Sequence, residues 1–170
     1  MKKLILLLLF VPLVSFGQVK NGEHNTYYES GELKVTVNYV DGVKQGLEKL
    51  FYESGSSLST ANYVDGLAQG EWKSFYKSGE LRDTVNYVDG LREGEAKYYY
   101  DSDLLLRYTV KSIVSYVDGL RQGEWKEYYE TGELQLTVNY VSGLEQGELK
   151  YYYKSGELEV TANYVDGVKQ

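Results

Sequence analysis

The tetrapeptide Tyr-Val-Asp-Gly recurs along this chain at an almost constant spacing. It begins at Tyr39, Tyr63, Tyr87, Tyr116 and Tyr164, and the variant Tyr-Val-Ser-Gly begins at Tyr140. Successive copies are 24 residues apart, except for one interval of 29 residues. A fixed period of this kind is typical of stacked repeats, in which each unit contacts its neighbours. The sequence therefore predicts six tandem units of about 24 residues over residues 18–170, with a five-residue insertion within 104–115 and a truncated last unit.

Each unit has the pattern of a β-hairpin. In residues 33–40 the side chains of Leu33, Val35, Val37 and Tyr39 fall on one face of a strand, and the Thr and Asn residues between them fall on the other. A Ser-Gly or Thr-Gly turn joins the two strands of a unit, and the Asp-Gly turn joins one unit to the next. The glycines of the first turn are Gly31, Gly55, Gly79, Gly132 and Gly156, and Asp103 takes their place in the fourth unit.

These hairpins predict an all-β fold: an elongated, single-sheet antiparallel β-meander of about twelve short strands, solenoid-like in its order. The abundance of Tyr (19 residues) and Gly (18 residues) beside a single Pro favours strands and tight turns. Two alternatives remain open. A closed propeller needs about four strands and about 40 residues per blade, which exceeds this unit. A two-layer sandwich would be another way to bury the aromatic face.

The repeat pattern resembles a known family. Tyr39, Gly42, Gly46, Phe51 and Tyr52 exemplify Tyr-x-x-Gly-x-x-x-Gly followed by an aromatic-Tyr pair, which is similar to the MORN repeat and particularly to its bacterial variant. The likeness spans residues 22–170. It implies a run of β-hairpins used for assembly, for protein contact or, in some eukaryotic members, for association with lipid head groups, and it implies no catalytic residues. Bacterial members often carry an antitoxin label, so the resemblance also implies an antitoxin-like function as an alternative.

The first 17 residues have the layout of a secretory signal peptide. Lys2 and Lys3 precede an apolar run over residues 4–14, and Ser15 and Gly17 supply small residues for cleavage. We expect removal of residues 1–17 and export to the periplasm, the outer envelope or the exterior. A retained anchor is the alternative, although a membrane span needs about 18 apolar residues. Cleavage would leave 16 basic and 25 acidic residues, a formal net charge of −9, so nucleic acid is not expected as a partner.

Few residues offer catalytic or metal chemistry. With His24 as the only histidine and no cysteine, an ordinary transition-metal site is not expected. Rows of Asp in the turns and of Glu after the second glycine could bind Ca²⁺, but Asp-Gly is a preferred hairpin turn and surface Glu keeps a long sheet soluble. The Thr-x-Asn column could match a repetitive ligand, such as ice or a crystalline polysaccharide. The sequence predicts a protein that is not an enzyme, with no catalytic residues, no metal and no cofactor.

The aromatic columns are the candidate binding surface. Adjacent residues of a strand point to opposite faces, so one ring of each aromatic pair can be buried while the other is free to contact a ligand. The candidate aromatic groove consists of Trp72, Tyr76, Tyr100, Trp125, Tyr129 and Tyr153.

These observations favour a non-catalytic scaffold for protein–protein interaction or assembly at the cell envelope or exterior, with a protein partner in the groove. The alternative is a carbohydrate or cell-wall binding module that stacks a glycan on Trp72 and Trp125. The chain stops at Tyr-Val-Asp-Gly-Val-Lys-Gln, and an unpaired strand is a template for association. Self-association through the C-terminal strand edge is therefore also expected.

Overall fold

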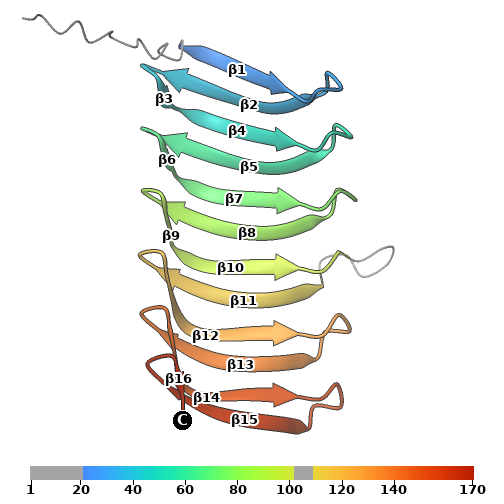
Figure 1. Cartoon of the computed structure of the whole chain (residues 1–170), viewed down its shortest axis with the longest axis vertical. Helices are drawn as coiled ribbons and strands as arrows, with labels where there is room; N and C mark the ends of the chain where they lie inside the picture. Colours follow the sequence, from blue (N-terminus) through green and yellow to red (C-terminus); the bar gives the residue numbers. More distant parts are fainter. Residues whose placement is uncertain (1–20, 102–108) are drawn as a thin grey trace, which may run out of the picture.

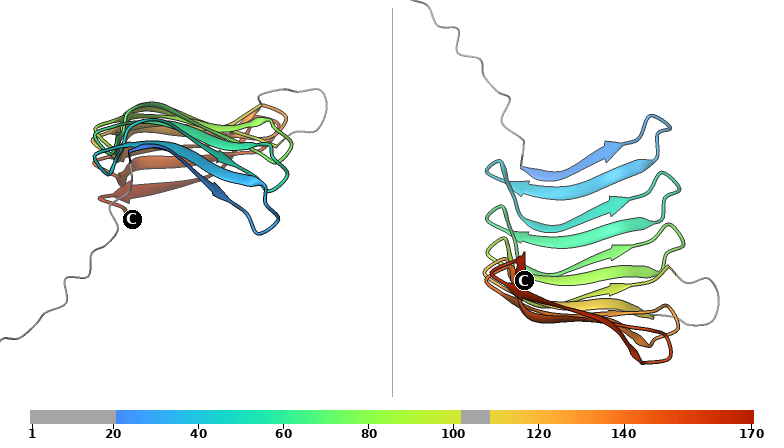
Figure 2. Two further views of the ribbon diagram at one scale, coloured as in Figure 1. Left: turned by 90° about the horizontal axis from the view of Figure 1, so that it is seen from above. Right: turned by 60° about the horizontal axis from the view of Figure 1, so that its bottom comes forward.

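The computed structural model describes residues 21–101 and 109–170. These residues form one open antiparallel sheet whose strands follow one another in chain order (Figure 1). The sheet is a single twisted and curved layer (Figure 2), so the prediction of an open β-meander is confirmed. The predicted signal peptide (residues 1–17), Asp103 and residues 104–108 of the predicted insertion lie outside the described residues.

Six hairpins make up the sheet. Their first strands are β1 (Gly22–Tyr27), β4 (Gly46–Phe51), β7 (Gly70–Phe75), β10 (Gly94–Tyr99), β12 (Leu120–Tyr128) and β14 (Leu144–Tyr152). Their second strands are β2 (Leu33–Val40), β5 (Ser57–Val64), β8 (Leu81–Val88), β11 (Val110–Val117), β13 (Leu134–Val141) and β15 (Leu158–Val165).

Four additional strands of two residues each raise the total above the twelve predicted. They are β3 (Val43–Lys44), β6 (Leu67–Ala68), β9 (Leu91–Arg92) and β16 (Val168–Lys169). The first three are separated from β4, β7 and β10 by one residue, directly before a glycine with positive φ: Gly46, Gly70 and Gly94. In β12 and β14 the strand continues through the equivalent glycine, and only the register with the neighbouring strand shifts. The repeated second glycine therefore marks a β-bulge.

The two predicted kinds of turn lie at opposite ends of the strands (Figure 1). We call these two sides of the sheet, each formed by a row of turns, its Asp-Gly edge and its other edge. At the Asp-Gly edge the first central residue has a φ of 49–51° and the following glycine a φ of 78–84°, including Ser142 and Gly143 in the variant copy. Positive φ at both positions is the geometry of a type I′ hairpin turn, which matches the twist of the flanking strands. At the other edge, the glycines of the Ser-Gly and Thr-Gly turns also have positive φ.

The hydrophobic core lies on one face of the sheet. One cluster contains Val85, Ala96, Val114 and Tyr116. A second contains Leu136, Val138 and Tyr140, and Trp125 packs against both clusters. This face, called the aromatic face below, also carries the other tyrosines of the tetrapeptide and Trp72. Because its rings cover the row of small aliphatic residues, they serve in place of a second sheet.

The opposite face, called the polar face below, carries the predicted Thr and Asn columns and a row of ion pairs. Lysines pair with a glutamate two residues earlier on the same strand, at nitrogen–oxygen distances of 2.7–2.9 Å: Glu71–Lys73, Glu95–Lys97, Glu124–Lys126 and Glu148–Lys150. In these four pairs, the glutamates considered for Ca²⁺ binding are thus already paired with lysines. Among residues 21–101 and 109–170 no three His, Asp or Glu side chains are grouped so that they could hold a metal ion. In the same residues no helix is long and apolar enough to cross a bilayer.

Candidate binding surface

In five of the six aromatic pairs, the second residue is a tyrosine that connects one hairpin to the next. The Tyr28 hydroxyl donates a hydrogen bond of 2.7 Å to the backbone carbonyl of Phe51. The same bond, at 2.7–2.8 Å, runs from Tyr52, Tyr76, Tyr100 and Tyr129 to the carbonyls of Phe75, Tyr99, Tyr128 and Tyr152. We call this row the tyrosine clamp. A register shift at each aromatic pair places the second ring beyond the end of its strand, so the pair does not simply alternate across the sheet.

Three predicted groove residues, Tyr76, Tyr100 and Tyr129, therefore belong to the tyrosine clamp. Lysine ammonium groups also lie near two of their rings, 5.7 Å from Tyr100 and 5.5 Å from Tyr129. Tyr153 occupies the same column, is 49% exposed, and its hydroxyl makes no hydrogen bond to another described residue. The column has a structural role that its residue types alone did not reveal.

A second row of contacts connects the hairpins at the Asp-Gly edge. The side-chain oxygen of Gln45 accepts a hydrogen bond of 2.8 Å from the backbone N–H of Asp65 in the next turn. Gln69, Gln122 and Gln146 repeat this contact, and Glu93 replaces the amide in the fourth unit. Sequence analysis missed this row, although the recurring Gln-Gly dipeptide was visible.

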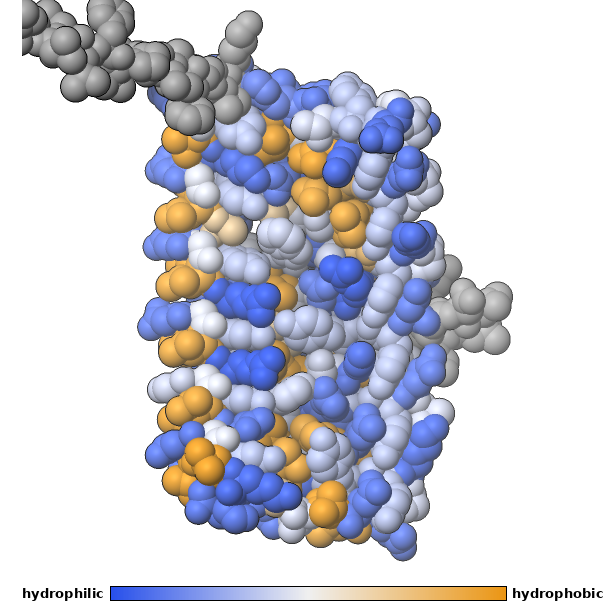
Figure 3. All heavy atoms as spheres, in the orientation of Figure 1, coloured by the Kyte–Doolittle hydropathy of each residue, from blue (hydrophilic) through white to orange (hydrophobic). Residues whose placement is uncertain are grey.

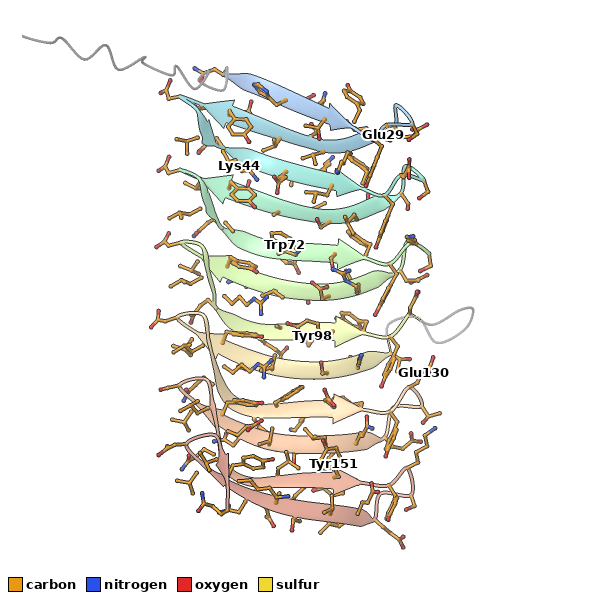
Figure 4. The ribbon with its side chains drawn as sticks, viewed as in Figure 1. Glu29, Lys44, Trp72, Tyr98, Glu130 and Tyr151 are labelled. Carbon is orange, nitrogen blue, oxygen red and sulfur yellow. The ribbon has the colours of Figure 1, made fainter. Side chains whose placement is uncertain are left out.

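The two tryptophans lie on the aromatic face. Trp72, labelled in Figure 4, packs against Tyr87. Trp125 packs against Tyr140 in the same way, and in both pairs the ring centroids are 5.8 Å apart and the planes are tilted. In β10, the equivalent strand of the hairpin between those of Trp72 and Trp125, this position holds Ala96, whose side chain is completely buried. The column of large rings is therefore interrupted at this point of the sheet.

A hollow of about 470 Å³ opens beside this interruption, and we call it the central hollow. Its lining combines aromatic rings with charged groups, four of them basic and two acidic. The lining includes Tyr76, Tyr98, Tyr99, Tyr116, Trp125, Arg82, Arg92, Lys111, Arg121, Asp83 and Glu127. Of the six residues predicted for the groove, Tyr76 and Trp125 line the central hollow and the other four do not. The space-filling view shows strongly hydrophilic side chains (dark blue) beside paler ones over the middle of the sheet (Figure 3).

Two arginines that line the central hollow donate hydrogen bonds to tyrosine hydroxyls. Arg92 Nη1 donates to the Tyr116 hydroxyl at 3.1 Å, and Arg121 Nη1 donates to the Tyr140 hydroxyl at 3.2 Å. Burial and a hydrogen bond to Tyr116 raise the pKa of Tyr98 to about 12. Burial opposes ionisation of Tyr116, but hydrogen bonds from Tyr98, Arg121 and Arg92 outweigh it and lower the pKa of that hydroxyl. The environment thus makes the Tyr116 hydroxyl more acidic than the Tyr98 hydroxyl.

This difference predicts a late step in an alkaline titration. The folded pKa of Tyr98 lies above the ordinary value of 10.0, so folding stabilises its protonated form. Its contribution to stability is complete below pH 10 and is lost as the pH rises toward 12. Tyrosinate absorbance of the folded protein should contain a component near pH 12 that is missing in the Tyr98→Phe variant. Identical titration curves for the two proteins would contradict the assignment.

Sequence analysis did not identify Tyr98, Arg92 or Arg121 as site residues. The signal that could have found them is a departure from the repeat. Arg92 and Arg121 occupy the column that holds Lys44, Ala68, Glu145 and Lys169 elsewhere, and Ala96 interrupts the column of Trp72 and Trp125. The candidate site is built from positions at which the units differ, so the positions that the units share do not reveal it.

A single layer of hairpins, connected at both edges by repeated side-chain contacts, defines the class of this protein as a β-hairpin repeat scaffold. The model of the MORN repeat variant matches residues 20–41, 44–65, 68–89, 121–142 and 145–166, which together are more than half of the chain. The chain belongs to this family, and the predicted resemblance is confirmed. MORN repeats are generally implicated in binding proteins or membranes, and the family is generally non-catalytic.

Other comparisons add little. No curated protein matches the chain. Among solved structures, a crystal structure of a GtfA/B complex bound to UDP and GlcNAc aligns with 80% of this chain and 26% of that chain, at 12% identity and a TM-score of 0.29. The chain thus spans about a quarter of that protein's length.

Proposed function

We propose that this protein is a non-catalytic scaffold that binds a protein partner on its aromatic face at the cell envelope or exterior. The observation that supports this most is the composition of the central hollow, where Trp125, Tyr98 and two arginines remain accessible on a single-layer sheet. Tryptophan, tyrosine and arginine are the residues most enriched at the energetic centres of protein interfaces.

The polar face is the weaker candidate for a protein interface. Its lysines and glutamates already pair with each other on β7, β10, β12 and β14. A partner would have to break these exposed pairs or leave them hydrated, and exposed charge pairs contribute little to affinity. The aromatic face offers apolar area together with cationic groups, so binding there removes more apolar surface from water.

Glycan binding has less support at Trp125. The Arg121 guanidinium carbon lies 5.0 Å from the Trp125 ring, so one face of that ring is in contact with a cation. A sugar that stacks on this ring would compete with Arg121 for the same surface. This arrangement favours a partner that contacts ring and guanidinium together.

Site-specific photo-crosslinking tests the proposal. A photoreactive amino acid is placed at Glu127, which lines the central hollow, or at Thr137 on the polar face, in the full chain expressed in whole cells. Both positions are half-buried and lie on neighbouring strands, so they are a matched pair. We expect a discrete protein adduct from position 127 and none from position 137, in the envelope or extracellular fraction.

Adducts from position 137 alone, or from neither position, would contradict binding on the aromatic face. Accumulation of the protein in the cytoplasm would refute the proposed location and would favour the antitoxin-like alternative. Quenching of tryptophan fluorescence by cell-wall glycans, without any protein adduct, would favour the carbohydrate-binding alternative.

A further inference from the structure

Within the described residues, Arg92 and Arg121 of the central hollow have no carboxylate partner, whereas Arg82 is paired with Asp83. In the repeat column of Arg92 and Arg121, Lys44 forms an ion pair with the buried Glu48 four residues later. The position four residues after Arg92 is Ala96, and after Arg121 it is Trp125. Within residues 21–101 and 109–170, neither guanidinium lies within 4.0 Å of a carboxylate oxygen. Neither position therefore supplies a carboxylate that could neutralise the cation.

Both guanidinium groups are nevertheless held in place. Arg92 donates to the hydroxyls of Tyr116 at 3.1 Å and Tyr87 at 3.4 Å, and Arg121 donates to the hydroxyl of Tyr140 at 3.2 Å. Arg92 lies 5.2 Å from the Tyr116 ring centroid, and Arg121 lies 5.0 Å from that of Trp125. An arginine has five N–H donors, so most donors of each group are left for a ligand. Fixed guanidinium groups lose little conformational entropy when they bind a carboxylate.

The charge around the central hollow contrasts with that of the whole protein. The chain has a formal net charge of −7. Arg82, Arg92, Lys111 and Arg121 line the central hollow against only Asp83 and Glu127. Asp83 is already paired with Arg82, whose Nε lies 3.0 Å from its carboxylate. The remaining lining carries more positive than negative groups, in a chain whose net charge is negative.

From this geometry we infer that the central hollow binds an acidic segment of the protein partner. An acidic side chain of the segment lies between Arg92 and Arg121, and a neighbouring apolar side chain packs against Trp125 and Tyr98. A long polyanion or an anionic membrane would meet the negative surface outside the central hollow and be repelled. A short acidic segment fits because it places its charge only where the local charge is positive. This inference rests on the proposed function and specifies the chemistry of the partner.

Calorimetric titration of the full chain with two peptides tests the inference. The probes are acetyl-Glu-Leu-Glu-Tyr amide and its matched partner acetyl-Gln-Leu-Gln-Tyr amide. We expect the Glu peptide to bind at least about tenfold more tightly, because charge-assisted hydrogen bonds are about twice as strong as neutral ones. Its affinity should fall as salt is added. Equal affinities of the two peptides, or no binding of the Glu peptide at millimolar concentration, would overturn the inference.

Charge variants locate the binding to the central hollow. The Arg92→Gln and Arg121→Gln variants should each weaken the Glu peptide about tenfold. The Lys169→Gln variant makes the same charge change in the same column, outside the central hollow, and should bind normally. The Glu127→Gln variant removes a negative charge from the lining and should tighten binding a few-fold. Unchanged affinity in both arginine variants would exclude this site.

Two further arms identify the source of the carboxylate. If N-acetylglutamate binds as tightly as the Glu peptide, the ligand is a small acid and the partner segment is excluded. If phosphatidylglycerol vesicles bind more tightly than the Glu peptide, the ligand is a lipid surface.

Photo-crosslinking separates this inference from the proposed function. An adduct at position 127 that persists in the double arginine variant overturns the acidic segment alone, whereas a wild-type protein without any adduct overturns the proposed function.

Discussion

Replacement of Trp125 by alanine is expected to lower the free energy of unfolding by about 3 kcal/mol, near the lower end of the range for a large aromatic residue because the ring is only half-buried. Trp125 packs against Val114 and its cluster on one side and against Val138 and its cluster on the other. Its removal exposes both rows of aliphatic residues to water. Urea unfolding followed by far-ultraviolet circular dichroism measures the change.

The same substitution should also change the shape of the unfolding transition. In a repeat array each unit contacts only its neighbours, and cooperativity depends on the interfaces between units. Trp125 is the residue that packs against both clusters, so its loss should let the N-terminal and C-terminal hairpins unfold in separate steps. Trp72→Ala is the matched control, since Trp72 is not among the residues packed on either cluster. A loss below 1 kcal/mol, or a larger loss from Trp72→Ala, would contradict this account of the core.

The fold could be predicted from the sequence because its signals are local. An Asp-Gly dipeptide favours a type I′ turn, and the strands on either side of such a turn must pair. Repetition of the turn every 24 residues then determines the order of all strands, since adjacent units have no alternative partner nearby. The extra two-residue strands were missed because a bulge at the second glycine depends on how two strands pair.

The candidate site was harder to predict because it depends on contacts between units. Nothing in the type of residue distinguishes Tyr100, whose hydroxyl connects two hairpins, from Tyr98, which lines the central hollow. Their roles follow from the register shift that separates them in space. The central hollow lies near Ala96, a small residue in a column of larger ones, and is lined by its strand neighbour Tyr98 and by Val114 opposite. A repeat pattern describes what the units share, whereas the charged groups of this candidate site lie at positions where the units differ.

The tyrosine clamp leads to the second large expected effect. Simultaneous replacement of Tyr76, Tyr100 and Tyr129 by phenylalanine should lower the free energy of unfolding by about 3 kcal/mol. A neutral hydrogen bond contributes about 1 kcal/mol, and each substitution also leaves a backbone carbonyl at a hairpin end without its partner. Phenylalanine keeps the ring, so the packing of this edge is preserved. Urea unfolding of the triple variant and of each single variant measures the sum and its parts.

Tyr153→Phe is the control that separates the hydroxyl from the ring. Tyr153 stands in the same column, but within the described residues its hydroxyl donates to no carbonyl, so its removal should change stability by less than 0.5 kcal/mol. If the four single variants behave alike, the hydrogen bonds do not connect the hairpins and packing alone holds the array together. If only the three clamp residues matter, the regular spacing of the hairpins is maintained by this row of hydroxyls, which places Arg92 and Arg121 of neighbouring units beside the same hollow.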